Sequence, residues 1–204
     1  MKGKVSKNKF LKVVLPALLV VAIICQAVGF QAVLAKGNVA TTSSDSISNL
    51  TDQQLQALTN PILQSYKADS SHKVWKMTND SRLAVLANQT NIENARLQEV
   101  VKLVNSEFVE KEIISSPLAM VYAQEKDVSY GDILIDIDQT SSITSSSNSK
   151  EAYKITIGEN GVRLTGASEN AIMHGLRTIQ NLIITNDGLV YGEIVDYPNV
   201  AERR

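Results

Sequence analysis

The sequence has few of the residues that most often cross-link a small protein or hold a metal ion. Of its 204 residues, one is cysteine, Cys25, and two are histidine, His72 and His174. One cysteine cannot form an internal disulfide, and a zinc site needs several cysteine or histidine ligands at regular spacings. We therefore expect the core to hold the fold, and we expect no metal and no cofactor.

Aromatic residues are also scarce, at 5% of the chain, and the one tryptophan is Trp75. With lysines on both sides it could stack on a sugar, but partial burial at the domain edge is the prediction, because tryptophan is seldom fully exposed. The chain lacks the Gly-x-Ser-x-Gly turn of serine hydrolases and the glycine spacing of phosphate-binding loops. No catalytic residue is predicted from these patterns.

Acidic residues are missing from the first 35 positions, which hold five lysines. All 21 acidic residues follow Ala35, so the rest of the chain is net acidic. It offers no basic stripe of the kind that binds nucleic acid. We expect no nucleic-acid partner.

An apolar run at residues 13–30 follows these lysines, and small residues follow up to Ala35. A basic start, an apolar run and a small-residue exit are typical of a secretory signal peptide, so residues 1–35 are predicted to be one. An uncleaved anchor stays open, because the run is nearly long enough to span a bilayer. The predicted location is bacterial and extracellular, either secreted or at the cell surface.

Residues 36–59 include a tract rich in Ser, Thr and Asn and are predicted to be a flexible spacer. A short helix over 51–58, capped by Thr51, is possible within it. Pro61 would end that helix, because the residue before a proline avoids the α conformation. The folded domain is predicted over residues 60–198.

Strands are predicted at residues 82–87, 118–123 and 132–138. In the last of these, three isoleucines alternate with acidic residues and are expected to face the core. The acidic residues are expected on a solvated strand face rather than at a metal ion, because EF-hand spacing and its glycine are absent. These residues are Asp132, Asp136 and Asp138.

Two helices are predicted from apolar stripes with helical spacing. The first, at about 91–110, begins at a capping-box pattern, Thr90 with Glu93, in which each side chain bonds a free backbone N–H of the other. The second follows Ser168, a good N-cap, and has Gly175 beside its stripe. The two stripes are Leu97, Val101, Val104 and Phe108, and Ile172, Leu176, Ile179 and Ile183.

A hairpin is the clearest local signal. Alternating apolar residues at 153–157 and 162–164 flank Asn160-Gly161, which can take the positive φ angles of a tight turn. A final strand is predicted at 189–195. The order of elements indicates an α+β fold, with two helices on one face of a mixed or antiparallel sheet.

Residues 151–183 and 193–198 resemble the N-terminal domain of family 20 glycoside hydrolases, the β-N-acetylhexosaminidases. The family pattern has Glu-x-Tyr, a hairpin, a helix with Gly-Leu-x-Thr-x-x-Gln-Leu, and a strand ending in Asp-x-Pro. The glutamine position holds Asn181. The matching residues are Glu151, Tyr153, Gly175, Leu176, Thr178, Leu182, Asp196 and Pro198.

The resemblance implies a (β/α)8 barrel after this domain, with the active site at the barrel's C-terminal face. It implies a Glu general acid in that barrel and an Asp that orients the substrate's own acetamido group as nucleophile. Residues 199–204 would begin the barrel, and Arg203 matches by position the family arginine that hydrogen-bonds the sugar. Arg204 stands where the family has glycine. This chain is expected to lack the catalytic pair and to be inactive alone.

The predicted function is that of the non-catalytic N-terminal domain of a secreted β-N-acetylhexosaminidase, which removes terminal N-acetylhexosamine from glycans. Its partners would be the catalytic barrel of the same polypeptide and, through the whole enzyme, a glycan. Two alternatives stay open. One is a stand-alone exported module that binds glycan or protein, and the other is the same domain in a related glucuronidase or hyaluronidase-like glycosidase.

Overall fold

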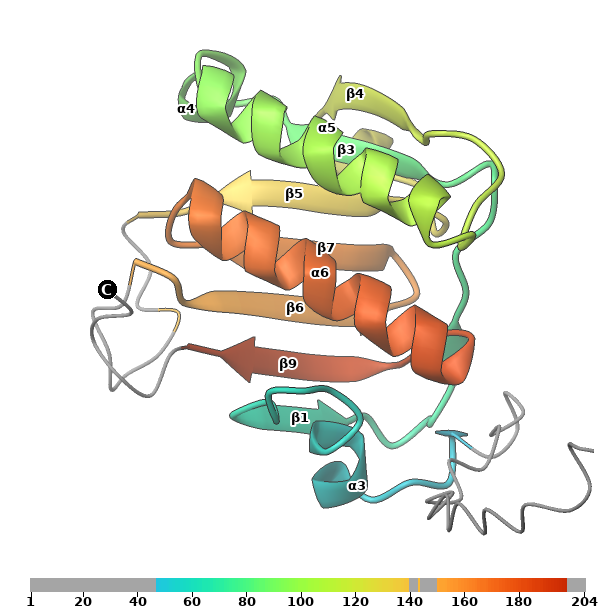
Figure 1. Ribbon diagram of the computed structural model, residues 1–204. Helices are drawn as coiled ribbons and strands as arrows, with labels where there is room; N and C mark the ends of the chain where they lie inside the picture. The colour runs from blue at the N-terminus through green and yellow to red at the C-terminus, as the bar shows by residue number, and fades with distance from the viewer. Residues whose placement is uncertain (1–46, 140–142, 144–149, 198–204) are drawn as a thin grey trace, which may run out of the picture. The chain divides into compact units, whose positions relative to one another are not determined.

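The computed structural model describes residues 47–139, 143 and 150–197 (Figure 1). Within them, a seven-stranded mixed sheet carries two long helices on one face. This is the predicted α+β class. The predicted signal peptide lies outside the described residues. No helix in the described part of the chain is both long and apolar enough to cross a membrane.

The main sheet has the strand order β1-β9-β6-β7-β5-β3-β4, and β2 pairs with β8 in a separate two-stranded sheet. Strands β3, β4, β5 and β7 run parallel, while β6 is antiparallel to both β7 and β9. The carboxyl ends of five strands (β3, β4, β5, β7 and β9) therefore lie along the same side of the sheet. We call this row of strand ends the carboxyl edge. The strands are β1 (Ser65–Ala68), β2 (Val74–Trp75), β3 (Arg82–Leu86), β4 (Ala119–Ala123), β5 (Ile133–Ile137), β6 (Tyr153–Gly158), β7 (Gly161–Gly166), β8 (Leu189–Val190) and β9 (Gly192–Asp196).

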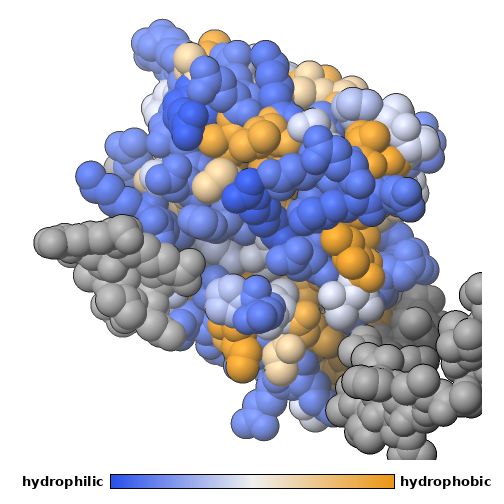
Figure 2. All heavy atoms as spheres, in the orientation of Figure 1, coloured by the Kyte–Doolittle hydropathy of each residue, from blue (hydrophilic) through white to orange (hydrophobic). Residues whose placement is uncertain are grey.

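Helices α5 (Ala95–Glu110) and α6 (Glu169–Asn186) bury the apolar stripes that the sequence predicts. All four stripe residues of α5 are fully buried, and so are the first three of α6, whereas Ile183 is half-buried. These side chains share one core with the inward-facing residues of β5, β6 and β7. The helix-bearing side of the molecule is largely hydrophilic, with several separate apolar patches (Figure 2).

The ordered domain begins before residue 60, within the predicted spacer. Helix α3 (Asp52–Gln56) has the predicted cap at Thr51, with a capping box to Gln54. Leu55 is fully buried in the main core, and Ile47 is 1% exposed there. The predicted spacer of 36–59 therefore contains an ordered segment from residue 47 onward, in which Ile47 and Leu55 pack into the core.

The start of the first long helix differs from the prediction. Thr90 and Glu93 do not form its cap; instead Asn88 caps a four-residue helix, α4 (Gln89–Ile92), and Asn94 caps α5. The side chain of Asn91 turns inward and accepts a hydrogen bond from the backbone N–H of Ile137 at 3.2 Å. This hydrogen bond holds α4 against β5, which explains why the helical segment is interrupted between α4 and α5.

The predicted final strand is two strands. Residues 189–190 pair with β2, and Gly192 then starts β9, which pairs with β6 and β1. Gly192 has a φ of 150°, and a Cβ there would lie 2.1 Å from the carbonyl oxygen of Lys67. The break therefore allows the chain to pass from one sheet to the other beside β1.

The β6–β7 hairpin is present with the predicted alternation, but the turn differs in one respect. Gly161 has a positive φ of 89°, whereas Asn160 does not have a positive φ. A Cβ on Gly161 would lie 2.7 Å from the carbonyl oxygen of Asp132. One glycine therefore provides both the turn conformation and the close approach to the loop before β5.

Candidate functional site

Three residues of the family-like pattern meet at the carboxyl edge, although they come from β6, α6 and β9. The hydroxyl of Tyr153 lies 2.6 Å from Oγ1 of Thr178 and donates to Oδ2 of Asp196 at 2.9 Å. The other carboxylate oxygen of Asp196 accepts from the backbone N–H of Gln64 at 3.2 Å. We call Tyr153, Thr178 and Asp196 the exit cluster, because the chain leaves β9 there.

Electrostatics favour one protonation state in the exit cluster. Burial raises the pKa of the Tyr153 phenol, and the negative charge of Asp196 raises it further. The phenol therefore stays protonated and can donate to the carboxylate. Both carboxylate oxygens of Asp196 are engaged, so its arrangement is that of an anchor at the end of β9 rather than of a catalytic acid.

The acidic residues of β5 do not form the predicted solvated face. Asp132 is 2% exposed and Asp136 is 7% exposed. Arg82 binds both oxygens of Asp132, with Nε at 2.9 Å from Oδ1 and Nη2 at 2.5 Å from Oδ2. Burial alone would raise the pKa of Asp132, but the bonds from Arg82 and from the N–H of Ser129 outweigh it and hold the pKa below its ordinary value.

Asp136 is held by a second set of partners on the same sheet face. Asn91 and Asn88 donate their amides to its Oδ1 at 3.0 and 3.2 Å, and Nη2 of Arg163 lies 3.3 Å from its Oδ2. The alternation pattern failed here because these partners lie 27 to 48 residues away in the chain. Both acids are structural, and in the described ranges no three His, Cys, Asp or Glu side chains gather as metal ligands.

Trp75 is not partly buried at an edge, as the sequence predicts, but fully buried. Its indole N–H donates to the carbonyl oxygen of Tyr130 at 2.7 Å. A tryptophan with no exposed surface cannot stack on a sugar. Of the two histidines, His72 is exposed in a loop and His174 is half-buried on α6.

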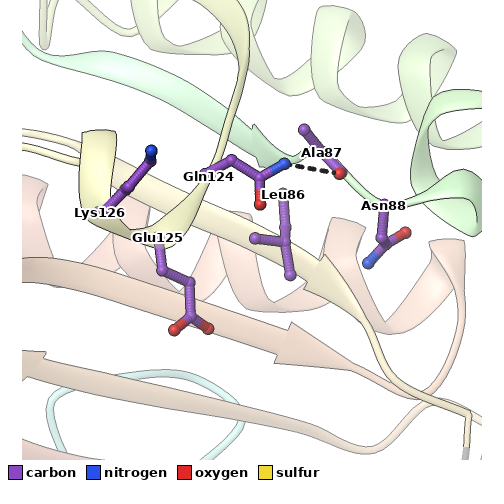
Figure 3. Close-up of a pocket in the computed structure, with 6 residues that line it drawn as sticks. All are labelled: Leu86, Ala87, Asn88, Gln124, Glu125 and Lys126. Carbon is purple, nitrogen blue, oxygen red and sulfur yellow. Dashed lines mark hydrogen bonds between the residues drawn. The ribbon is translucent and has the colours of Figure 1, made fainter.

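A shallow pocket opens at the carboxyl edge, beside the ends of β3 and β4 (Figure 3). Nε2 of Gln124 donates to the carbonyl oxygen of Ala87 across it at 3.1 Å. Glu125 forms an ion pair with Arg163 of β7. The lining residues are Leu86, Ala87, Asn88, Gln124, Glu125 and Lys126.

Sequence reasoning missed the pocket because its lining comes from two short segments, at the end of β3 and after β4, that carry no motif. The one signal available was that each segment lies at or just after the end of a predicted strand. The predicted sugar contact, Arg203, lies outside the described residues, as do all of residues 199–204. Its role stays a prediction.

One comparison, with protein-family models, identifies the family of this chain. The model of glycosyl hydrolase family 20, domain 2, matches residues 59–197. A comparison with curated protein sequences gives no match.

Several solved structures are similar in fold. The Streptomyces plicatus N-acetyl-β-hexosaminidase has a TM-score of 0.53 at 14% identity, over 74% of this chain and 28% of that one. The Flavobacterium johnsoniae chitobiase has a TM-score of 0.50 at 15% identity, over 68% of this chain and 20% of that one.

The chain thus spans between a fifth and three tenths of the length of these two enzymes. At such identities the structural likeness concerns the fold alone, whereas the family model covers most of the chain and includes the exit cluster. The chain belongs to glycosyl hydrolase family 20 and contains domain 2 of that family.

Proposed function

We propose that this chain is the non-catalytic N-terminal domain of a secreted β-N-acetylhexosaminidase. In this proposal a catalytic barrel follows in the same polypeptide and removes terminal N-acetylhexosamine residues from glycans. The observation that carries it is the family match over residues 59–197, which ends where the exit cluster anchors β9.

The exit cluster gives the domain a definite task. Asp196 binds β6 through Tyr153 and the start of β1 through Gln64, so the last residues of β9 are tied to two neighbouring strands. Whatever follows Tyr197 then leaves from a fixed position. A rigid junction of this kind holds two domains in one orientation better than a free linker does.

The charged groups of the described residues support a non-catalytic role. The buried carboxylates Asp132 and Asp136 are bound by arginines or amides, and Asp196 is bound by a phenol and a backbone N–H. A general acid or base needs to reach the bond that reacts, and these three groups face protein partners.

Arg203 is proposed as a sugar contact of the whole enzyme. The test is kcat/KM of the complete gene product for a chromogenic N-acetylglucosaminide. Arg203→Ala should lower it about 10- to 100-fold, the range for a hydrogen bond from a charged donor, with Arg204→Ala as the control. Equal activity of the Arg203→Ala and unmodified enzymes would remove Arg203 from the site.

Secretion is proposed from the basic and apolar pattern of residues 1–35. Mass spectrometry of the exported protein should find Lys36 as the first residue. An exported protein that still begins at Met1 would instead support the uncleaved anchor.

The reading frame beyond Arg204 tests the proposed domain order. We expect it to continue for at least about 250 residues with a (β/α)8 pattern and an adjacent Asp-Glu pair. A stop codon directly after Arg204 in an intact gene would contradict the proposal and favour the stand-alone module.

A further inference from the structure

The strands β4, β3 and β5 lie in the order 4-3-5 and run parallel. The chain passes from β3 to β4 through α5, which lies on the helix-bearing face. From β4 to β5 it passes over the opposite face, where Val128 packs against a small apolar cluster of Ala84, Ala123 and Leu134. The connection that leaves β3 and the connection that leaves β4 therefore run over opposite faces of the sheet. Where the connections of two neighbouring strands diverge in this way, a crevice opens at the carboxyl ends of the strands, which is the usual ligand position in such sheets.

The pocket of Figure 3 lies at this position. Leu86, Ala87 and Asn88 come from the end of β3, and Gln124, Glu125 and Lys126 come from the end of β4. Leu86 and Ala87 give it an apolar portion. The amides, the carboxylate and the ammonium group around them are hydrogen-bonding partners for a polar ligand.

The charges at the pocket balance. Glu125 forms an ion pair with Arg163, and Arg163 also contacts Asp136 behind the pocket. Lys126 supplies the second positive charge. Among the lining residues themselves, Glu125 and Lys126 carry one charge of each sign, so the lining has no net charge to select an anion or a cation. A neutral ligand with hydroxyl groups and an apolar face fits this lining best.

We propose that this pocket binds the ring of a neutral sugar. The choice of a sugar rests on the proposed role in a glycan-hydrolysing enzyme, while the neutral and polar character follows from the lining. Asn88 contributes only shape, because its amide caps α4 and donates to Asp136. Hydroxyl groups of the ring bind the Gln124 amide, which keeps one N–H beside its bond to Ala87, and the Glu125 oxygen that does not contact Arg163. Its C–H face lies on Leu86 and Ala87.

The test is a titration of the isotope-labelled chain with N-acetylglucosamine, followed through its backbone amide NMR signals. Because the pocket is shallow and a monosaccharide is small, we expect a dissociation constant of about 1 mM or weaker. The signals of residues 86–88 and 124–126 should shift with one common saturation curve. Glucuronate and glucosamine, which carry a charge, should bind no better than the neutral sugar.

Two variants and a matched control complete the test. Gln124→Ala should weaken binding about fivefold through the loss of a hydrogen bond. Ala87→Leu should abolish binding by filling the pocket. Gln98→Ala is the control. The amide of Gln98 likewise donates to a backbone carbonyl oxygen, that of Ile92 at 3.3 Å, but Gln98 lies on α5 and does not line the pocket. It should leave binding unchanged.

Other results would overturn the inference. They are an absence of shifts in the pocket at high sugar concentration, shifts at another surface, or tighter binding of a charged sugar. Such failure would leave the proposed domain role intact, because that role is tested by the reading frame and by hydrolysis in the complete gene product.

Discussion

Asp132 is almost completely buried yet charged, because Arg82 binds both of its oxygens while Ser129 donates a backbone N–H at 2.7 Å. The side chain of Arg82 is 35% exposed, so solvent weakens the pair on one side. The pair fastens β3 to the loop that leads into β5. Removing one partner of a buried pair leaves the other uncompensated, which costs more than the pair itself contributes.

We predict that Asp132→Asn lowers the free energy of unfolding at pH 7 by about 2 kcal/mol, below the range for fully buried pairs because Arg82 is partly exposed. The folded-state pKa of Asp132 is lowered, so its contribution is complete above the ordinary pKa of about 4 and is lost as pH falls through the lower value. When the free energy of unfolding is measured in urea at each pH from 7 to 2.5, it should therefore fall less steeply with falling pH for the variant than for the unmodified protein. Asp80→Asn, in an exposed loop, should follow the unmodified protein, and an equally steep curve for Asp132→Asn would contradict this account.

Tyr153→Phe tests the exit cluster at the same scale. The variant keeps the ring and removes the hydroxyl that binds Thr178 and Asp196. Because buried Thr178 and half-buried Asp196 each lose a hydrogen bond, we expect the free energy of unfolding to fall by about 1–3 kcal/mol. Tyr122→Phe, an exposed tyrosine of β4, is the matched control and should change it little. If chemical denaturation showed an equally small loss of unfolding free energy for Tyr153→Phe and Tyr122→Phe, the exit cluster would have no structural role.

At the scale of elements, α6 lies close to the sheet at Gly175. A Cβ there would lie 2.3 Å from Cδ1 of Leu164 on β7 and 3.2 Å from Cδ2 of Tyr153 on β6. The glycine permits the helix to approach the strands that carry the exit cluster.

Gly175→Ala should therefore destabilise the protein by about 1–3 kcal/mol through overpacking, even though alanine favours a helix by about 1 kcal/mol. Thermal denaturation of a double-mutant cycle with Leu164→Ala measures the coupling. The second substitution makes room for the new methyl, so the two costs should not add. Additive costs would show that the contact with Leu164 is not the cause.

The caps of α4 and α5 give a second prediction for an element. Asn94→Ala should lower the free energy of unfolding by about 1 kcal/mol, because its side chain accepts from the N–H of Leu97 at 2.9 Å. Thr90→Ala is the control, since Thr90 lies inside α4 and not at a cap. If guanidinium denaturation showed a larger loss of stability for Thr90→Ala than for Asn94→Ala, the capping box predicted from the sequence would be supported instead.

The sequence predicted the parts of the fold that depend on local periodicity. The stripes of α5 and α6 and the hairpin were found because each repeats over enough residues to show its period. Strands β1 and β2 were missed, since they have four and two residues and depend on pairing with β9 and β8. The buried aspartates were misplaced for the same reason, because the partners that stabilise them are distant in sequence.

At the scale of the whole molecule, the carboxyl edge joins the features that bear on function. Five strands end there, the pocket opens beside β3 and β4, and the exit cluster ends β9. The family pattern predicted the residues of the exit cluster as matches but not their mutual contacts. The pocket could not be predicted, because it depends on the β3–β4 and β4–β5 connections running over opposite faces of the sheet.

The chain that leaves this edge is, in our account, the start of a catalytic domain. The most direct test of that claim is hydrolysis of a chromogenic N-acetylglucosaminide by two purified proteins, the complete gene product and residues 1–204 alone. The account predicts turnover by the complete gene product and none above buffer by residues 1–204. Turnover by residues 1–204, or none by a folded complete gene product, would contradict it.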